Sequence, residues 1–220
     1  MRGLFLFLGV AALICGGCAR QYRDTTLYQL SGRQKPIVAV LPVINYVADD
    51  ELKWDLSREL TDEIRKRVYD SKRIYLLREN GSMEIAKALS TPNPNAIPYS
   101  ALSGLGAAGF AVVAELIEQE EQSYGVAKAS MDDSVRSEIG AVLSLALRVR
   151  VIDVRHETPK IILQEVLDQD FVIARAYMRA DYEKNPWGTE AYNRTPMGLA
   201  HGRLVRELVA RIEAYIEASL

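Results

Sequence analysis

Cysteine is almost missing from this chain, and both of its cysteines lie near the start. Among 220 residues only Cys15 and Cys18 carry a thiol. Everything after Cys18 therefore lacks the side chain needed for an internal disulfide, a cysteine nucleophile or a thiolate metal site. A body without thiols suits an oxidising compartment.

Excess positive charge is missing as well. The chain has 27 lysines and arginines against 29 aspartates and glutamates, which gives a formal net charge of −2. Nucleic-acid binding depends on a basic surface that displaces phosphate counterions, so this balance argues against a nucleic-acid partner. The composition, 49% hydrophobic and 25% charged, is typical of an ordinary globular protein, and we expect one domain.

Long apolar runs are limited to the amino terminus. The run at residues 4–14 is uninterrupted, but it is short for a membrane-spanning helix, which needs about 20 residues. An arginine before this run and two glycines after it follow the pattern of a cleaved signal peptide. We expect cleavage directly before Cys18. Cleavage before Cys15 would place the bulky Ile14 at a site that prefers small side chains.

This segment resembles the lipobox of bacterial lipoproteins, with Cys15 at the position where leucine is usual. The resemblance implies that Cys18 is acylated, so that membrane lipid is the first partner. Ala19, in place of aspartate, implies sorting to the outer membrane, with the domain facing the periplasm. An uncleaved anchor or an ordinary secretory signal is the alternative. We predict a removed signal peptide at 1–17, lipidated Cys18 and a tether at 18–36, and a single domain at 37–220.

The body opens with a strand and a long amphipathic helix. Residues 37–43 are β-branched and apolar, as in a strand buried on both faces. Asp49 and Asp50 are the candidate caps for a helix of about 20 residues. Its apolar positions recur every fourth residue, at Leu52, Leu56, Leu60, Ile64 and Val68. The charged positions between them predict a solvated face, formed by Arg58, Glu59, Asp62, Glu63, Arg65 and Lys66.

The remaining pattern predicts further strands and helices. Thr195 and Pro196 have the residue types of a helix cap and first turn, and an apolar stripe follows them. Residues 118–137 read as a polar connection with little strand signal. We predict a single α/β (α+β) domain of order β-α-β-α-β-β-β-α, with helices packed on a mixed, mostly antiparallel sheet of about five strands. The predicted later elements are strands at 74–77, 110–117, 143–151 and 160–173 and a short helix at 83–89.

Part of this pattern resembles a known periplasmic superfamily. It includes the TolB amino-terminal domain, the curli secretion-channel lipoprotein CsgG and the lipoprotein LpoB. The resemblance lies in PIVAVLPVINYVADD, the amphipathic helix after it and RIYLLRE, and later in LALRVRVIDV. It implies a protein-binding module of the cell envelope without catalytic residues. Function still has to be argued from this chain's own residues.

Motifs for catalysis or cofactor binding are weak. Gly104, Gly106 and Gly109 spell a dinucleotide fingerprint, but a strand-like segment follows them instead of a helix, so we expect a small-residue turn. His156 and His201 are the only histidines and lack partners at motif spacing, which favours surface or packing roles. We therefore predict no metal site, no cofactor and no small-molecule substrate.

Aromatic residues gather in one predicted loop. Tyr182, Trp187 and Tyr192 follow Tyr177 and Arg179 and are interleaved with lysine, asparagine and proline. Large rigid rings with basic neighbours are typical of protein interfaces, so these three residues are the candidate partner-binding site. The alternative is a loop that folds back onto the body through its own aromatics.

The leading hypothesis from sequence is a non-enzymatic envelope lipoprotein that binds another envelope protein, as an assembly factor or activator does. The second is an oligomeric subunit of an outer-membrane secretion channel, similar to CsgG. Residues 118–137 lack the alternation of a membrane hairpin, which argues against the channel. The third is an envelope enzyme that uses carboxylates.

Overall fold

The computed structural model describes residues 26–47, 54–78, 82–93, 96–123, 139–177 and 180–220. Cys18, Asp49 and Asp50, on which the lipidation and helix-cap predictions depend, lie outside these residues. Within the described part no helix is long and apolar enough to cross a bilayer. Just before the domain, Tyr28 and Gln34 form an isolated bridge, and the side chain of Lys35 is already buried.

The elements follow the predicted order with two short additions, β2 and α3. They are β1 (Ile37–Val40), β2 (Ile44–Asn45), α1 (Leu56–Ser71), β3 (Tyr75–Leu76), α2 (Met83–Leu89), α3 (Tyr99–Ser103), β4 (Phe110–Ser123), β5 (Ile139–Asp153), β6 (Lys160–Ala174), the 3-10 turns η2 (Arg175–Tyr177) and η3 (Tyr192–Arg194), and α4 (Pro196–Ala218).

One mixed sheet organises the molecule. The strand order is β3-β1-β4-β5-β6, with β2 beside β4. The pairings of β1, β2 and β3 are parallel, whereas the long strands β4, β5 and β6 pair antiparallel. The predicted α+β fold with a mixed, mostly antiparallel sheet is confirmed, with six strands where about five were expected.

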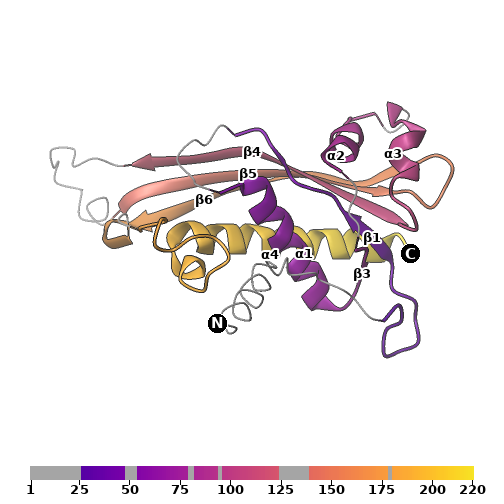
Figure 1. Ribbon diagram of the computed structural model, residues 1–220, viewed down its shortest axis with the longest axis horizontal. Helices are drawn as coiled ribbons and strands as arrows, with labels where there is room; N and C mark the ends of the chain where they lie inside the picture. Colours follow the sequence, from indigo (N-terminus) through magenta and orange to yellow (C-terminus); the bar gives the residue numbers. More distant parts are fainter. Residues whose placement is uncertain (1–25, 48–53, 79–81, 94–95, 124–138, 178–179) are drawn as a thin grey trace, which may run out of the picture.

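Helices cover the two faces of the sheet unequally (Figure 1). Helices α1 and α4 pack against each other and form the larger core with one face. Helices α2 and α3 form a smaller core at one end of the other face. Strand β1 contributes to both cores, since Val38 and Val40 belong to the first, and Ala39, with Leu41 directly after the strand, to the second. This confirms a strand buried on both faces.

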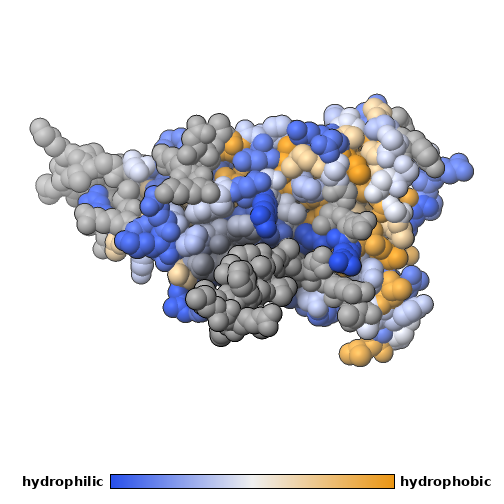
Figure 2. Space-filling view, in the orientation of Figure 1, coloured by the Kyte–Doolittle hydropathy of each residue, from blue (hydrophilic) through white to orange (hydrophobic). Residues whose placement is uncertain are grey.

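Exposed apolar side chains are unevenly spread on the face of the molecule that Figure 2 draws. Figure 2 shows hydrophobic side chains gathered toward the end that carries α2, α3 and β3, and mostly hydrophilic ones at the opposite end. On the edge strand β6, the side chains of Val166 and Val172 are exposed.

Strand β4 is longer than predicted. The polar connection expected from residue 118 starts only after Ser123, because residues 118–123 continue the antiparallel ladder with β5. A register shift between Leu116 and Glu118 precedes this extension. The strongly patterned β5 supplies hydrogen-bonding partners along its whole length, and this tertiary pairing overrides the weak strand preference of the glutamates.

Helix α1 is shorter than predicted. Its cap is Asp55, whose carboxylate accepts hydrogen bonds from the backbone N–H groups of Ser57 and Arg58. The helix ends at Lys72, which has a left-handed backbone conformation with φ of 60°. It therefore has 16 residues, where about 20 were expected. The start of α4 is confirmed, with Thr195 as cap and Pro196 in the first turn.

Candidate functional site

The charged side of α1 is not simply solvated, which corrects the sequence prediction. Glu59 is 2% exposed and Arg65 is 7% exposed. Both residues lie on positions that the fourfold apolar repeat leaves outside the core. Glu59 meets α4 and the loop before it through His201 and Tyr192, whereas Arg65 donates a hydrogen bond to the Leu77 carbonyl after β3. Burying a carboxylate costs folding free energy unless its oxygens are hydrogen-bonded, so Glu59 requires donors around it.

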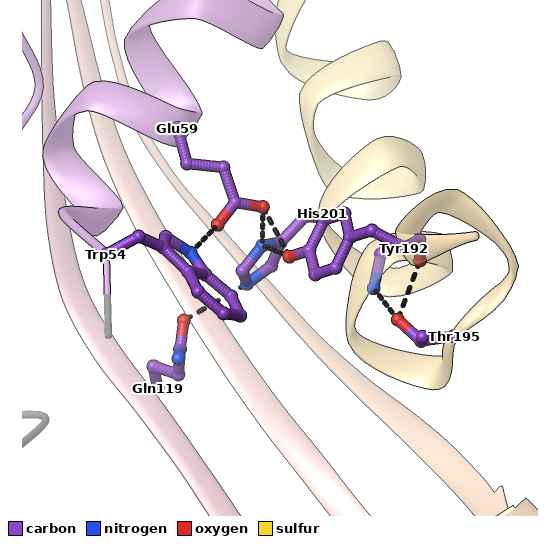
Figure 3. Close-up of polar contacts among 7 residues, drawn as sticks. Trp54, Glu59, Gln119, Tyr192, Thr195 and His201 are labelled. Atoms are coloured by element: carbon purple, nitrogen blue, oxygen red, sulfur yellow. Dashed lines mark hydrogen bonds and ion pairs between the residues drawn. The ribbon is translucent and has the colours of Figure 1, made fainter. Parts of the chain in front are cut away.

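Three donors surround the Glu59 carboxylate (Figure 3). The indole Nε1 of Trp54 donates to Oε2 at 2.8 Å, and the hydroxyl of Tyr192 donates to Oε1. Nδ1 of His201 lies 2.7 Å from Oε1. We define Trp54, Glu59, Gln119, Tyr192 and His201 as the buried polar cluster. It joins α1, β4, η3 and α4.

His201 bridges Glu59 to the sheet. Because an ionised carboxylate only accepts hydrogen bonds, Nδ1 of His201 carries a proton toward Glu59. On the other side of the ring, Nε2 lies 3.1 Å from Oε1 of Gln119 on β4. A protonated Nε2 donates to that oxygen, whereas an unprotonated Nε2 accepts from the amide nitrogen once the Gln119 amide turns over. In either arrangement the ring of His201 joins Glu59 on α1 to Gln119 on β4.

Opposing effects act on the pKa values of the cluster. Burial raises the pKa of Glu59, but the hydrogen bonds and charge of His201 and the donors Tyr192 and Trp54 outweigh it, so the pKa lies below its ordinary value of 4.5. Burial, followed by the negative charge of Glu59, raises the pKa of the Tyr192 hydroxyl far above its ordinary range. Glu59 is therefore ionised and Tyr192 is a neutral donor at neutral pH.

The arrangement is closed and holds the chain in place. Glu59, Tyr192 and His201 are each at most 3% exposed, so a substrate has no access to these groups. A tyrosine, a histidine and a glutamate in contact have the residue types of a catalytic relay, but Tyr192 is bound to the carboxylate and strongly disfavoured as an anion. The described residues contain no group of three or more potential metal-ligating side chains.

The loop that carries the predicted interface folds back onto the body. Tyr192 is 2% exposed and lies in the core, so its side chain is not available to a partner, which corrects the sequence prediction for this residue. Tyr182 and Trp187 are half-buried and pack against the core. The Trp54 ring meets Tyr192 edge-on at 5.7 Å and Tyr182 at 6.5 Å, while the Arg58 guanidinium lies 6.0 Å from the Trp187 ring.

Residues at the start of α4 also hold the aromatic loop, through contacts with the backbone of Tyr192. The Thr195 hydroxyl donates to the Tyr192 carbonyl at 2.7 Å and accepts from the Gly198 N–H at 3.1 Å. Gly198 packs so closely that a Cβ there would lie 2.1 Å from the Tyr192 carbonyl oxygen. Side-chain and backbone contacts therefore hold the same residue, Tyr192, from both sides.

A second buried ionic group lies on the other face of the sheet. Glu115 on β4 binds Arg150 at 2.9 Å and Arg148 at 2.7 Å. Arg150 also donates to the carbonyl of Ser90, the cap residue at the end of α2. This group attaches the end of α2 to the sheet.

Other sequence candidates are ordinary structure. Gly104, Gly106 and Gly109 form the turn between α3 and β4, as expected, and Gly106 has φ of 60°. His156 is exposed in the turn between β5 and β6. His201 is the histidine with a packing role, and no sequence motif points to its partners.

Residues 24–220 match the profile described as "Family of unknown function (DUF7499)". The chain belongs to this family. No curated protein sequence matches it. Among solved structures, it is similar to the hypothetical protein CT253 from Chlamydia trachomatis, with 33% identity and a TM-score of 0.69. That match covers 84% of this chain and 99% of the Chlamydia protein, so the whole domain is shared.

More distant similarity links the chain to two other solved structures. Lipoprotein GNA1162 from Neisseria meningitidis is 14% identical, with coverage of 80% of this chain and 97% of that protein and a TM-score of 0.39. A PelC dodecamer from Paraburkholderia phytofirmans is 11% identical, with coverage of 74% and 87% and a TM-score of 0.38. TM-scores this low support no conclusion about this chain.

Proposed function

We propose that this chain is a lipid-anchored protein of the bacterial cell envelope whose folded domain binds another envelope protein and catalyses no reaction. One observation carries the docking part of the proposal: the buried polar cluster uses its polar groups to hold a loop of aromatic residues against the body. An enzyme site directs such groups toward a substrate cavity. Here Glu59, Tyr192 and His201 are satisfied by one another.

The held loop has the properties of a docking surface. Tyr182 and Trp187 are half-buried, so each ring is fixed on one side and open on the other. A partner that contacts a fixed ring does not have to restrict its motion on binding, which favours affinity. Tyrosine, tryptophan and arginine dominate interface energetics, and Arg58 lies beside Trp187. Tyr182 and Trp187 remain the proposed contact residues, whereas Tyr192 acts as their support.

The lipoprotein part of the proposal depends on Cys18. The apolar run at residues 4–14 and the glycine pair before Cys18 support acylation there, with outer-membrane sorting inferred from Ala19. The resemblance to the TolB, CsgG and LpoB superfamily supports a periplasmic orientation. Anchoring would confine the domain to a membrane surface and raise its effective concentration toward other envelope proteins.

Affinity capture from lightly crosslinked envelopes tests the docking function. We expect the native chain to retain a defined envelope protein, and Trp187→Ala to lose most of it. The matched control is Tyr215→Ala, which removes an exposed ring from the far part of α4. Equal capture by all three chains would refute the assignment to this loop. Capture of nothing beyond background by the native chain would refute the docking function itself.

A further inference from the structure

A groove runs between the last residues of β6 and the first half of α4. Residues 171–174 of β6 form one wall, and Leu199 and Ala200 of α4 lie on the other. Arg203 and Arg206 also line it, and its volume is about 520 Å³. The groove continues toward the aromatic loop, because Tyr177 and Arg194 line both it and a neighbouring hollow beside Asp181.

The strand wall of this groove is a sheet edge. Strand β6 ends the strand order, and within the described residues no strand pairs with its outer side. Unpaired N–H and C=O groups along such an edge are a template for another strand. In the middle of β6, polar side chains that point toward α4 hinder the pairing of another strand. Glu165 pairs with Arg211 there, and Gln169 donates a hydrogen bond to Glu207. The final four residues of β6, Phe-Val-Ile-Ala, have no polar side chain.

The groove is apolar and positively charged. Tyr177, Leu199 and Val172 line it and are 65%, 61% and 64% exposed. Arg203 lies over the Phe171 ring at 5.9 Å. Neither Arg203 nor Arg206 forms an ion pair with any carboxylate in the part of the chain that the structure describes. Glu207, the nearest carboxylate on the helix, is engaged by Arg211 and Gln169. Arginines that form no ion pair among the described residues, beside exposed apolar side chains, suit an anionic occupant with an apolar portion.

We propose that this groove binds an extended segment of a partner protein, added as a strand to the edge of β6 and carrying both apolar and acidic side chains toward α4. This deepens, and rests on, the docking function proposed above. A peptide backbone supplies hydrogen-bonding partners for the open edge at residues 171–174, which a lipid chain lacks. Its apolar side chains lie between Phe171 and Leu199, and its acidic ones meet Arg203 and Arg206.

A designed peptide serves as the probe. Its sequence, Thr-Leu-Thr-Glu-Thr-Leu-Thr-Glu, places leucine and glutamate on one side of an extended strand. With the full chain in detergent, we expect saturable binding by fluorescence anisotropy and slower amide hydrogen exchange at residues 171–174. A peptide with lysine in place of glutamate should bind about tenfold more weakly, as should one with a central proline, which interrupts strand pairing.

Two charge reversals locate the site. Arg206→Glu should weaken binding of the acidic peptide about tenfold and improve binding of the lysine peptide. Arg33→Glu makes the same change of net charge on an exposed residue before β1, outside this groove, and should leave both affinities unchanged.

Several results would overturn the proposal. These are no binding, equal binding of the acidic and lysine peptides, an unaffected proline peptide, or residues 171–174 already protected in the free chain by a second copy or by its own segments. The proposed function has a separate readout. A partner captured equally by the native chain and by Arg206→Glu would leave the docking function standing and would refute this groove as its site.

Discussion

At the scale of single residues, Glu59 is the position on which the helix packing depends most. Its carboxylate is buried, ionised and bound by three donors, so loss of its charge leaves Trp54, Tyr192 and His201 incompletely paired. We expect Glu59→Gln to lower the free energy of unfolding by about 2–4 kcal/mol, measured by urea denaturation at pH 7. Asp70→Asn on the same helix, which loses an exposed pair with Lys66, should cost less than about 0.5 kcal/mol. Equal effects would contradict this ranking.

Glu59 also gives the stability a defined pH dependence. Its pKa in the folded chain lies below the ordinary value of 4.5, so its stabilising contribution is present above pH 4.5 and is lost as the pH falls through the lowered value. The difference in unfolding free energy between the native chain and Glu59→Gln should therefore shrink between pH 5 and pH 3. Other carboxylates titrate in both chains and cancel in the difference. A difference that stays constant over this range would contradict the assignment.

At the scale of elements, the close contact between α4 and η3 leaves no room for a larger side chain. An alanine at Gly198 would bring its Cβ within 2.1 Å of the Tyr192 carbonyl oxygen, so either the loop or the helix has to move. Gly198→Ala should cost about 1–3 kcal/mol and speed hydrogen exchange in residues 180–195. Gly202→Ala, one turn along α4, meets only an Arg67 side-chain nitrogen at 3.5 Å and should be neutral or stabilising, since alanine favours helices. Similar destabilisation by both would contradict the clash.

The elements differ in how far the sequence predicts them. Helix α4 and strand β5 follow from local patterns, because a cap, a proline and an apolar stripe act over a few residues. The extension of β4 does not, since its glutamates are paired by β5. The buried polar cluster is harder still to predict from sequence. Glu59 and His201 are 142 residues apart, and the packing of α1 on α4 brings them together. The clearest sequence signal for it was a lone histidine on an apolar helix face.

At the scale of the whole molecule, the sheet separates two kinds of surface. One face is closed by α1 and α4, and the buried polar cluster lies under them (Figure 1). On the other face α2 and α3 form the smaller core at one end, and Val166 and Val172 of the edge strand β6 are exposed. The aromatic loop and the groove both lie near the amino-terminal end of α4, whereas Gln29 and Arg33, in the described segment before β1, line a pocket together with residues of its carboxyl-terminal end. The predicted tether and the proposed docking surfaces thus meet α4 at opposite ends.

The proposed membrane anchoring depends on the sulfur atom of Cys18, and the two cysteines allow a matched test of it. Acyl chains contribute about 0.8 kcal/mol for each buried methylene, so a chain bearing several of them stays in the membrane fraction. In bacteria fed radiolabelled palmitate, we expect Cys18→Ser to abolish labelling and to release the chain from washed membranes, while Cys15→Ser keeps both properties. Loss of label from Cys15→Ser alone would move the acylated residue to Cys15. A Cys18→Ser chain that is unlabelled but still membrane-bound would instead favour an uncleaved amino-terminal anchor, because only apolar residues 4–14 would then remain to hold it.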